Sequence, residues 1–220
     1  MQGTDLLVND YDLLEEKERN DIVQSMHQSS KGLLNLLENL LTWSRSQTGK
    51  ISNKPDITDI YPIIMNNISL LELQANNKGI TLISNSKERT YGYFDVNMIN
   101  TVLRNLISNS IKFTNKDGTI TIGSKTNGKE LIIWVQDTGV GISKEVAGKL
   151  FKIASGHTTR GTADEKGTGL GLVLCKELVE KNNGKIWVES ELGVGTKFIV
   201  TLPVRKENQN NKHNSLKNSN

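Results

Sequence analysis

The strongest constraint on the fold is an abrupt change of hydrophobic pattern near Pro55 and Pro62. Before these prolines, apolar residues recur in steps of three and four, which is typical of a helix that packs along a seam. After them, short strand-like stretches alternate with helical stretches. Because proline interrupts regular structure, we place a domain boundary here. We predict a helical segment at residues 1–50, a linker at 51–59, a second domain at 60–204 and a disordered tail at 205–220.

The N-terminal segment is predicted to form a short helical stub followed by one long helix with a leucine-rich seam. The seam consists of Val23, Met26, Ser30, Leu33, Leu37, Leu40 and Ser44. Additional leucines widen the apolar stripe beyond a two-stranded seam, which favours a four-helix bundle. A single helix cannot bury such a face, so we expect a homodimer formed through residues 14–47.

Composition restricts the classes of partner. The chain is 35% hydrophobic and 23% charged, which is enough apolar material for one core. A net charge of +3 is too small to indicate a nucleic-acid partner. No run approaches the roughly 18 apolar residues of a membrane span, and the single Cys175 cannot form an internal disulfide. We therefore expect a cytoplasmic chain with no membrane segment and no nucleic-acid partner, although a longer parent protein could carry an anchor.

The second domain is predicted to be an α+β domain whose mixed sheet carries helices on one face. Its dense apolar run at 130–136 is typical of a strand buried on both faces. Helices are expected at 63–77, 96–114 and 170–181, and strands at 80–84, 91–94, 119–124, 130–136, 185–190 and 196–202.

A polar row is predicted on the second of these helices. Asn105, Asn109 and Lys112 lie at i, i+4 and i+7, which places two amides and an ammonium on one helix face. The opposite side is apolar and contains Leu103, Leu106, Ile107 and Ile111. A solvated surface is one interpretation of the polar row. The other is a magnesium–phosphate site, because oxygen ligands beside an ammonium suit that group.

Two glycine-containing segments follow the apolar strand. In the first, Gly139 and Gly141 would let the backbone approach a ligand, Asp137 could accept a hydrogen bond from an exocyclic amine, and Ile142 could cover a planar ring. An ordinary Asp-Gly turn is the alternative. The second segment opens a helix, and it contains Gly167, Thr168, Gly169, Leu170 and Gly171. Free N–H groups at a helix start favour a phosphate. The polar stretch 143–166 between the two segments is expected to be a mobile lid.

These motifs, taken in order, resemble those of a sensor histidine kinase catalytic domain. They read NLISNSIKFT, DTGVGIS, LFKIASGHTTRGT, EKGTGLGL and GTKFIVTLP. The resemblance covers about residues 56–203, and LLNLLENLLTWSRSQTGK resembles the second helix of that family's dimerisation and phosphotransfer domain. It implies the two-layer α/β sandwich shared with gyrase-type and heat-shock-chaperone ATPases, with ATP and magnesium as ligands.

The resemblance also implies roles for individual residues. Asn109 corresponds to the magnesium ligand, Asn105 and Lys112 to phosphate contacts, and Asp137 to the acceptor from the adenine amine. The remaining implied nucleotide-binding residues are Gly139, Gly141 and Ile142 in the adenine pocket, Gly167, Thr168, Gly169, Leu170 and Gly171 at the lid base, Arg160 and Lys166 as lid cations, and Thr196 in support of Asp137.

The implied reaction is transfer of the ATP γ-phosphoryl to a histidine of the dimerisation domain, with a response regulator as partner of the parent system. Hydrolytic relatives carry a glutamate where this chain has Asn105. The family's phosphoacceptor context, a histidine followed by an acidic residue and a proline, is absent around His27, His157 and His213, so we expect the chain to begin after the acceptor. Two alternatives stay open: a serine kinase of the anti-sigma-factor type, and a non-catalytic nucleotide-sensing scaffold.

Overall fold

The structure, a computed structural model, describes residues 7–9, 13–47, 52–152, 160–163, 165 and 169–205. The chain divides into two compact units, Met1–Ile51 and Ser52–Asn220. Residues 206–220 of the predicted tail lie outside the described residues.

The first unit contains the predicted long helix, α2 (Glu16–Gln47), which is 32 residues long. Among its described side chains, Leu33 and Leu37 keep 58% and 48% of their surface accessible in the single chain. The other exposed large apolar side chains of the described set are Val23, Met26, Leu34, Leu40 and Leu41. The described apolar side chains of α2 are therefore of the kind that pack against another helix, but they are exposed in the single chain.

The second unit is built on a mixed sheet, as predicted, and this sheet has five strands. Its strands are β2 (Thr81–Asn85), β4 (Thr119–Thr126), β5 (Glu130–Asp137), β6 (Lys185–Glu191) and β7 (Gly195–Pro203), in the spatial order β2-β4-β5-β7-β6. Strands β2 and β4 pair in parallel, and the other neighbours pair antiparallel.

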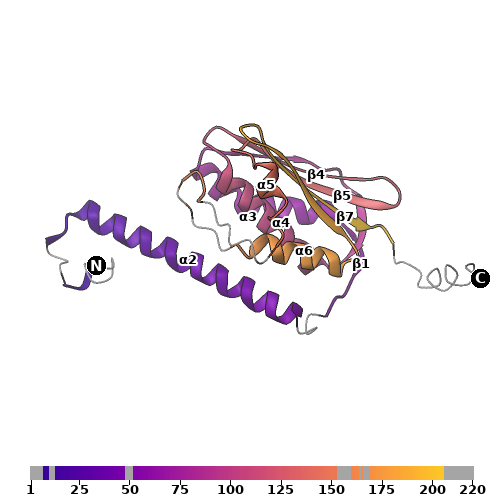
Figure 1. Cartoon of the computed structure of the whole chain (residues 1–220), viewed down its shortest axis with the longest axis horizontal. Coiled ribbons are helices and arrows are strands. Elements are labelled where there is room, and N and C mark those ends of the chain that lie inside the picture. Colours follow the sequence, from indigo (N-terminus) through magenta and orange to yellow (C-terminus); the bar gives the residue numbers. More distant parts are fainter. Residues whose placement is uncertain are drawn as a thin grey trace, which may run out of the picture. The chain divides into compact units, whose positions relative to one another are not determined.

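Three helices cover one face of this sheet: α3 (Ile60–Asn77), α4 (Val96–Phe113) and α6 (Gly171–Lys181) (Figure 1). The core lies between the two layers, where Leu103, Leu106 and Ile107 of α4 are at most 1% exposed. Inward side chains of the sheet complete this core, among them Ile120, Ile122, Leu131, Ile133, Val135 and Val200. The predicted two-layer α/β sandwich is confirmed.

Strand β5 corrects one prediction. Its burial alternates along the strand: Ile133 and Val135 are buried, Ile132 and Trp134 are only half-buried, and Gln136 is exposed. The prediction of a strand buried on both faces was wrong because helices cover only one face of the sheet. The apolar residues on the outer face give the strand a continuous apolar sequence without full burial.

A second, two-stranded sheet was not predicted. Strand β1 (Asp56–Asp59) pairs antiparallel with β3 (Tyr91–Phe94), although residues 56–59 read as linker. Asp59 then caps α3 by accepting a hydrogen bond from the Tyr61 N–H, and it also accepts from the Thr90 N–H. A four-residue helix, α5 (Lys144–Ala147), was likewise not predicted in the segment interpreted as a lid.

The start of this unit is tied to the ends of two of its helices. The Asn53 side chain donates to the carbonyl oxygen of Lys181 at the end of α6, at 2.6 Å. The Lys54 N–H donates to Asp95, the N-cap of α4, at 2.9 Å. The Asn182 side chain in turn accepts from the Asp95 N–H. These contacts hold α4 and α6, the two helices that carry candidate site residues, at their ends remote from the glycine segments.

Candidate functional site

Helix α4 presents the predicted polar row at the edge of the core. The Asn105 amide donates to the carbonyl oxygen of Thr101, one turn earlier, at 3.0 Å. Asn109 is half-buried, and within the described part of the chain its side chain makes no hydrogen bond. A half-buried amide oxygen of this kind is suited to a ligand, because polar groups removed from water need a partner.

Asp137 is the most tightly held polar side chain of the site. It ends strand β5, is 5% exposed, and receives three hydrogen bonds. The Ser110 hydroxyl donates to Oδ2 at 2.9 Å, while the N–H groups of Gly139 and Thr196 donate to Oδ1 at 3.0 and 3.2 Å. The Thr196 contact joins β7 to the end of β5. These contacts fix the orientation of the carboxylate.

The environment of Asp137 also changes its acidity. Burial raises the pKa of this carboxyl above its ordinary value of 3.8, and the Ser110 hydroxyl and the Gly139 and Thr196 amides oppose that rise only in part. A carboxylate that remains buried at neutral pH is costly unless it is hydrogen-bonded. Asp137 is therefore a candidate ligand-binding residue, because its burial costs free energy and its carboxylate can accept a hydrogen bond.

The first glycine segment packs against the end of α4 and the β6–β7 turn. A side chain at Gly139 would lie 2.4 Å from the carbonyl oxygen of Phe113, and one at Gly141 would lie 1.9 Å from that of Glu191. Gly141 also has a φ of 69°, which favours glycine. The next residue, Ile142, donates its N–H to the Ser190 hydroxyl and lines a cavity of about 440 Å³. Both glycines are thus required by close backbone packing.

The second glycine segment places the start of α6 beside α4. Gly169 has a φ of 72°, and a side chain at Gly171 would lie 3.1 Å from Asn105 Oδ1. Leu170 is the N-cap of α6 and has no side-chain capping bond, so its apolar side chain leaves the first N–H groups of the helix without that partner. The predicted site residues Lys166, Gly167 and Thr168 lie outside the described residues.

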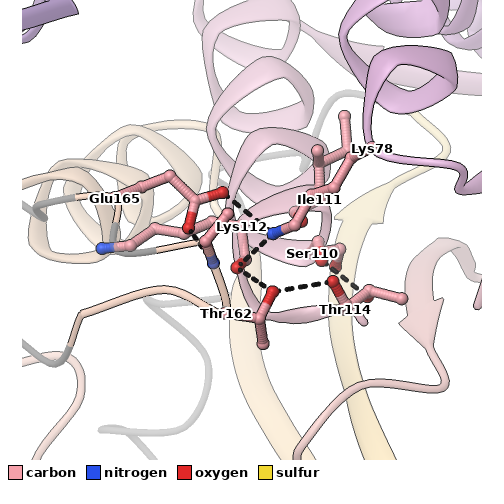
Figure 2. A network of polar contacts seen from close by, with 8 residues as sticks. Lys78, Ser110, Ile111, Lys112, Thr114, Thr162 and Glu165 are labelled. Atoms are coloured by element: carbon pink, nitrogen blue, oxygen red, sulfur yellow. Dashed lines mark hydrogen bonds and ion pairs between the residues drawn. The ribbon is translucent and has the colours of Figure 1, made fainter. Parts of the chain in front are cut away.

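A network of polar contacts surrounds Lys112 at the end of α4 (Figure 2). The Thr162 N–H donates to the Lys112 carbonyl oxygen at 3.0 Å, and the Thr162 hydroxyl donates to that of Thr114 at 2.9 Å. Partial burial lowers the pKa of the Lys112 ammonium, Glu165 opposes this effect and Lys78 adds to it. Arg160, a predicted lid cation, is exposed.

Sequence reasoning missed several residues of this arrangement. Ser110 had a signal, because it lies three and four residues after Ile107 and Leu106 in the buried stripe, where a polar side chain needs a partner. Lys78 and Glu165 had none, since they are 87 residues apart in the chain and meet only in the fold. Of the predicted site residues, the structure places Asp137 in hydrogen-bond contact with Gly139 and Thr196, and Gly171 beside Asn105, which shares α4 with Asn109 and Lys112.

The donor set fits magnesium held together with phosphate better than a metal held by protein alone. Among the described residues, no group of three or more His, Cys, Asp or Glu side chains could hold a metal ion. Magnesium keeps few protein ligands and completes its shell with phosphate oxygens and water, so a single amide oxygen such as that of Asn109 fits it. Cys175 is buried, and burial raises the pKa of its thiol to about 12.

Within the described ranges, no helix combines the length and the apolar character needed to cross a membrane.

Comparison with known proteins identifies the class first. Residues 94–206 match the family described as histidine kinase-, DNA gyrase B- and HSP90-like ATPases. This range contains α4, Asp137 and both glycine segments, so the fold and the site define a nucleotide-binding domain of this ATPase class.

Similarity over the longer range narrows the class to one family. The chain is 35% identical over 179 residues to the sensor protein SrrB of Staphylococcus aureus strain NCTC 8325 / PS 47, covering 79% of this chain. It spans only 30% of the length of that relative. The catalytic domain of histidine kinase ThkA matches 70% of this chain and 99% of its own with a TM-score of 0.60 and 26% identity. A structure of ThkA in complex with the response regulator TrrA matches 92% of this chain with a TM-score of 0.69 and 21% identity. The chain belongs to the sensor histidine kinase family of two-component systems.

Proposed function

We propose that the second unit binds ATP with magnesium and donates the γ-phosphoryl group to a histidine of a dimerisation domain. The observation that carries this proposal is the position of Asp137, a buried carboxylate at the end of β5, next to the polar row of α4 that contains Asn109 and Lys112. A hydrogen-bond acceptor for an amine and a set of groups for phosphate and magnesium thus lie at the same end of the core.

Each residue has a role that follows from its chemistry. Asp137 would accept the adenine amine, and Asn109 would offer its amide oxygen to magnesium. Lys112 and the first N–H groups of α6 would bind phosphate oxygens. Bound magnesium neutralises phosphate charge and orients the γ-phosphoryl group. The family's catalysis is mostly positioning and electrostatics, so the residues need only hold the phosphates in line with an acceptor.

Transfer is favoured over hydrolysis by the residue at position 105. An amide cannot take a proton from water at neutral pH, and the Asn105 amide nitrogen is engaged by the Thr101 carbonyl. Loss of a general base typically costs about 10² to 10⁴ in rate. The bound nucleotide should therefore persist until an acceptor histidine docks.

The experiment is incubation with γ-labelled ATP, with and without a supplied acceptor hairpin. We expect slow phosphate release alone and acid-labile label on the hairpin, and Asn109→Ala should abolish the transfer. Acid-stable label would favour the serine-kinase alternative. ATP binding without any transfer would favour the scaffold, and rapid phosphate release that Asn109→Ala abolishes would show that a base had been missed.

We further propose that α2 forms a homodimer and that the parent protein passes its phosphoryl group to a response regulator. The exposed leucines of α2 support the first proposal. Leu37→Asp would place an unpaired charge in the interface at a cost of several kcal/mol. Sedimentation should show a dimer that this variant dissociates, with Glu16→Gln at the start of α2 as control. A native chain that is monomeric at high concentration would refute dimerisation.

A further inference from the structure

The ammonium group of Lys78 joins three segments of the second unit. Lys78 is the C-cap of α3, and its side chain is 15% exposed. Its Nζ lies 2.9 Å from the carbonyl oxygen of Ile111, 2.8 Å from that of Lys112 and 2.8 Å from Glu165 Oε1. An ammonium has three N–H donors, so all of them are engaged.

The first two acceptors belong to the end of α4. The last carbonyls of a helix lack partners within the helix and carry partial negative charge, which a cation stabilises. Here the Lys78 ammonium and the Thr162 N–H both donate to the Lys112 carbonyl oxygen. The backbone of the residue proposed to bind phosphate is therefore held from two sides (Figure 2).

The third acceptor is Glu165, which precedes the second glycine segment in the sequence. Glu165 accepts from Lys78 with one carboxylate oxygen and from the Ala163 N–H with the other, at 2.9 Å. Its own carbonyl oxygen accepts from the Gly161 N–H at 2.9 Å. Gly161 passes so close to this carboxylate that an added side chain would lie 2.2 Å from Glu165 Oε2. Residues 161–163 and 165 are thus linked by hydrogen bonds and fixed to the end of α4 through Lys78 and Thr162.

We propose that Lys78 and Glu165 form a positioning pair that fixes residues 161–163 and 165 to the end of α4 and thereby holds Lys112 in place for the nucleotide phosphates. This inference rests on the proposed nucleotide function. Neither residue needs to touch the nucleotide, because both act through the groups they hold.

The pair differs from an ordinary surface ion pair of this domain. Lys176 and Glu180 lie one turn apart on α6, are about half-exposed and approach to 3.7 Å, so they link nothing beyond their own helix. Such exposed pairs contribute little to stability. Lys78 and Glu165 are 87 residues apart, and their contact also engages two helix carbonyls. The Lys176–Glu180 pair is therefore the matched control.

The first test measures ATP affinity by calorimetry with magnesium. Lys78→Met keeps the apolar stem, and Glu165→Gln keeps the shape, but each removes the charge pair. Both should weaken ATP binding by about three- to thirtyfold, which lies within the range typical of coupled contacts. Lys78→Arg should retain most of the affinity, and Lys176→Met and Glu180→Gln should leave it unchanged.

Two readouts separate positioning from general stability. Adenosine, used as a competitor, should bind the Lys78 and Glu165 variants as it binds the native chain, because the adenine end is untouched. Hydrogen exchange without nucleotide should be faster at residues 160–165 in Lys78→Met, while β5 and β7 keep their protection.

The outcomes are distinguishable from those of the proposed function. A native chain that binds no ATP refutes the proposed function. The exchange experiment without nucleotide still tests whether the Lys78–Glu165 pair holds residues 160–165. If the native chain binds ATP and the Lys78 and Glu165 variants bind it equally well, or if exchange at 160–165 is unchanged, the positioning pair is refuted. A lower thermal midpoint with unchanged ATP affinity would show that the pair only stabilises the fold.

Discussion

The two ends of the candidate nucleotide site differ in how completely the protein itself satisfies them. At the proposed adenine end, Asp137 is buried and receives three hydrogen bonds from Ser110, Gly139 and Thr196. At the proposed phosphate end, Asn109 is half-buried, and its amide makes no hydrogen bond to any described residue. The end proposed for adenine is held in place by the protein's own hydrogen bonds, whereas the end proposed for phosphate has polar groups that a ligand can complete.

This difference suggests that the two ends contribute differently to nucleotide binding. An acceptor that is already fixed binds its ligand with little loss of conformational entropy. Groups that a ligand completes can bind nucleotides with different phosphates to different extents. Substitutions at the adenine end should therefore alter affinity for every adenine nucleotide. Substitutions at the phosphate end should alter the dependence on magnesium and on the γ-phosphate.

The largest effect is expected for Asp137→Asn. The variant replaces a charged acceptor by an amide, and loss of a hydrogen bond to a charged group costs roughly 1.5 to 3 kcal/mol, or about ten- to a hundredfold in affinity. Calorimetry should show this loss for ATP and for ADP alike. Asp56→Asn, at an exposed position of β1, is the control and should change nothing. Unchanged ATP affinity in Asp137→Asn would overturn the adenine assignment.

Asn109→Ala should have the next largest effect, confined to the phosphate end. Removal of the amide oxygen should weaken ATP binding in the presence of magnesium by roughly tenfold, since phosphate oxygens and water still supply the other ligands. With a chelator present, the variant and the native chain should bind ATP alike. Asn97→Ala, at an exposed position in the first turn of the same helix, is the control. A loss that persists without magnesium would contradict the metal role.

Acid pH should weaken ATP binding through Asp137, by less than about tenfold per pH unit. Because burial raises the pKa of this carboxyl above 3.8, it takes up a proton at a higher pH in the folded protein than in the unfolded chain. Protonation removes the acceptor, so affinity falls as pH falls through the raised value. The contribution of the same group to stability has the opposite sign: it is present below the unfolded pKa and is lost as pH rises through the folded pKa.

The opposite signs provide the control for this pH prediction. Affinity and free energy of unfolding should both be measured against pH for the native chain and for Asp137→Asn. As the pH falls, the difference in ATP affinity between the native chain and Asp137→Asn should become smaller. Over the same range, the free energy of unfolding of the native chain should rise relative to that of the variant. Parallel curves for both proteins would show that Asp137 does not titrate in this range.

The smallest effect is expected for Ser110→Ala. It removes one of the three donors to Asp137, and loss of a single hydrogen bond costs about 0.5 to 1.5 kcal/mol, or about two- to tenfold in affinity. Ser69→Ala on the exposed side of α3 is the control. An effect as large as that of Asp137→Asn would mean that the adenine end depends on Ser110 for its folding.

The sequence predicted those parts of the molecule whose signals are local. The helical spacing of α4, the strand that ends in Asp137 and the glycines around it can all be identified within a few residues. Strand β1 could not, because four residues between prolines gain their structure from β3, more than 30 residues away. The Lys78–Glu165 contact depends on two segments that meet only in the folded domain. The outer face of β5 was misjudged because half-buried tryptophan and isoleucine have the same hydrophobicity as core residues.

The most direct test of the account is hydrogen exchange of the whole chain with and without magnesium and a non-hydrolysable ATP analogue. We expect the amides of Gly139 and Thr196, which donate to Asp137, to be protected already without nucleotide, and residues 160–165 and the first turn of α6 to gain protection when it binds. Equal exchange everywhere in both states would show that no nucleotide binds at this site. A gain in protection that is largest at Gly139 and Thr196 would show that the adenine end is not preformed.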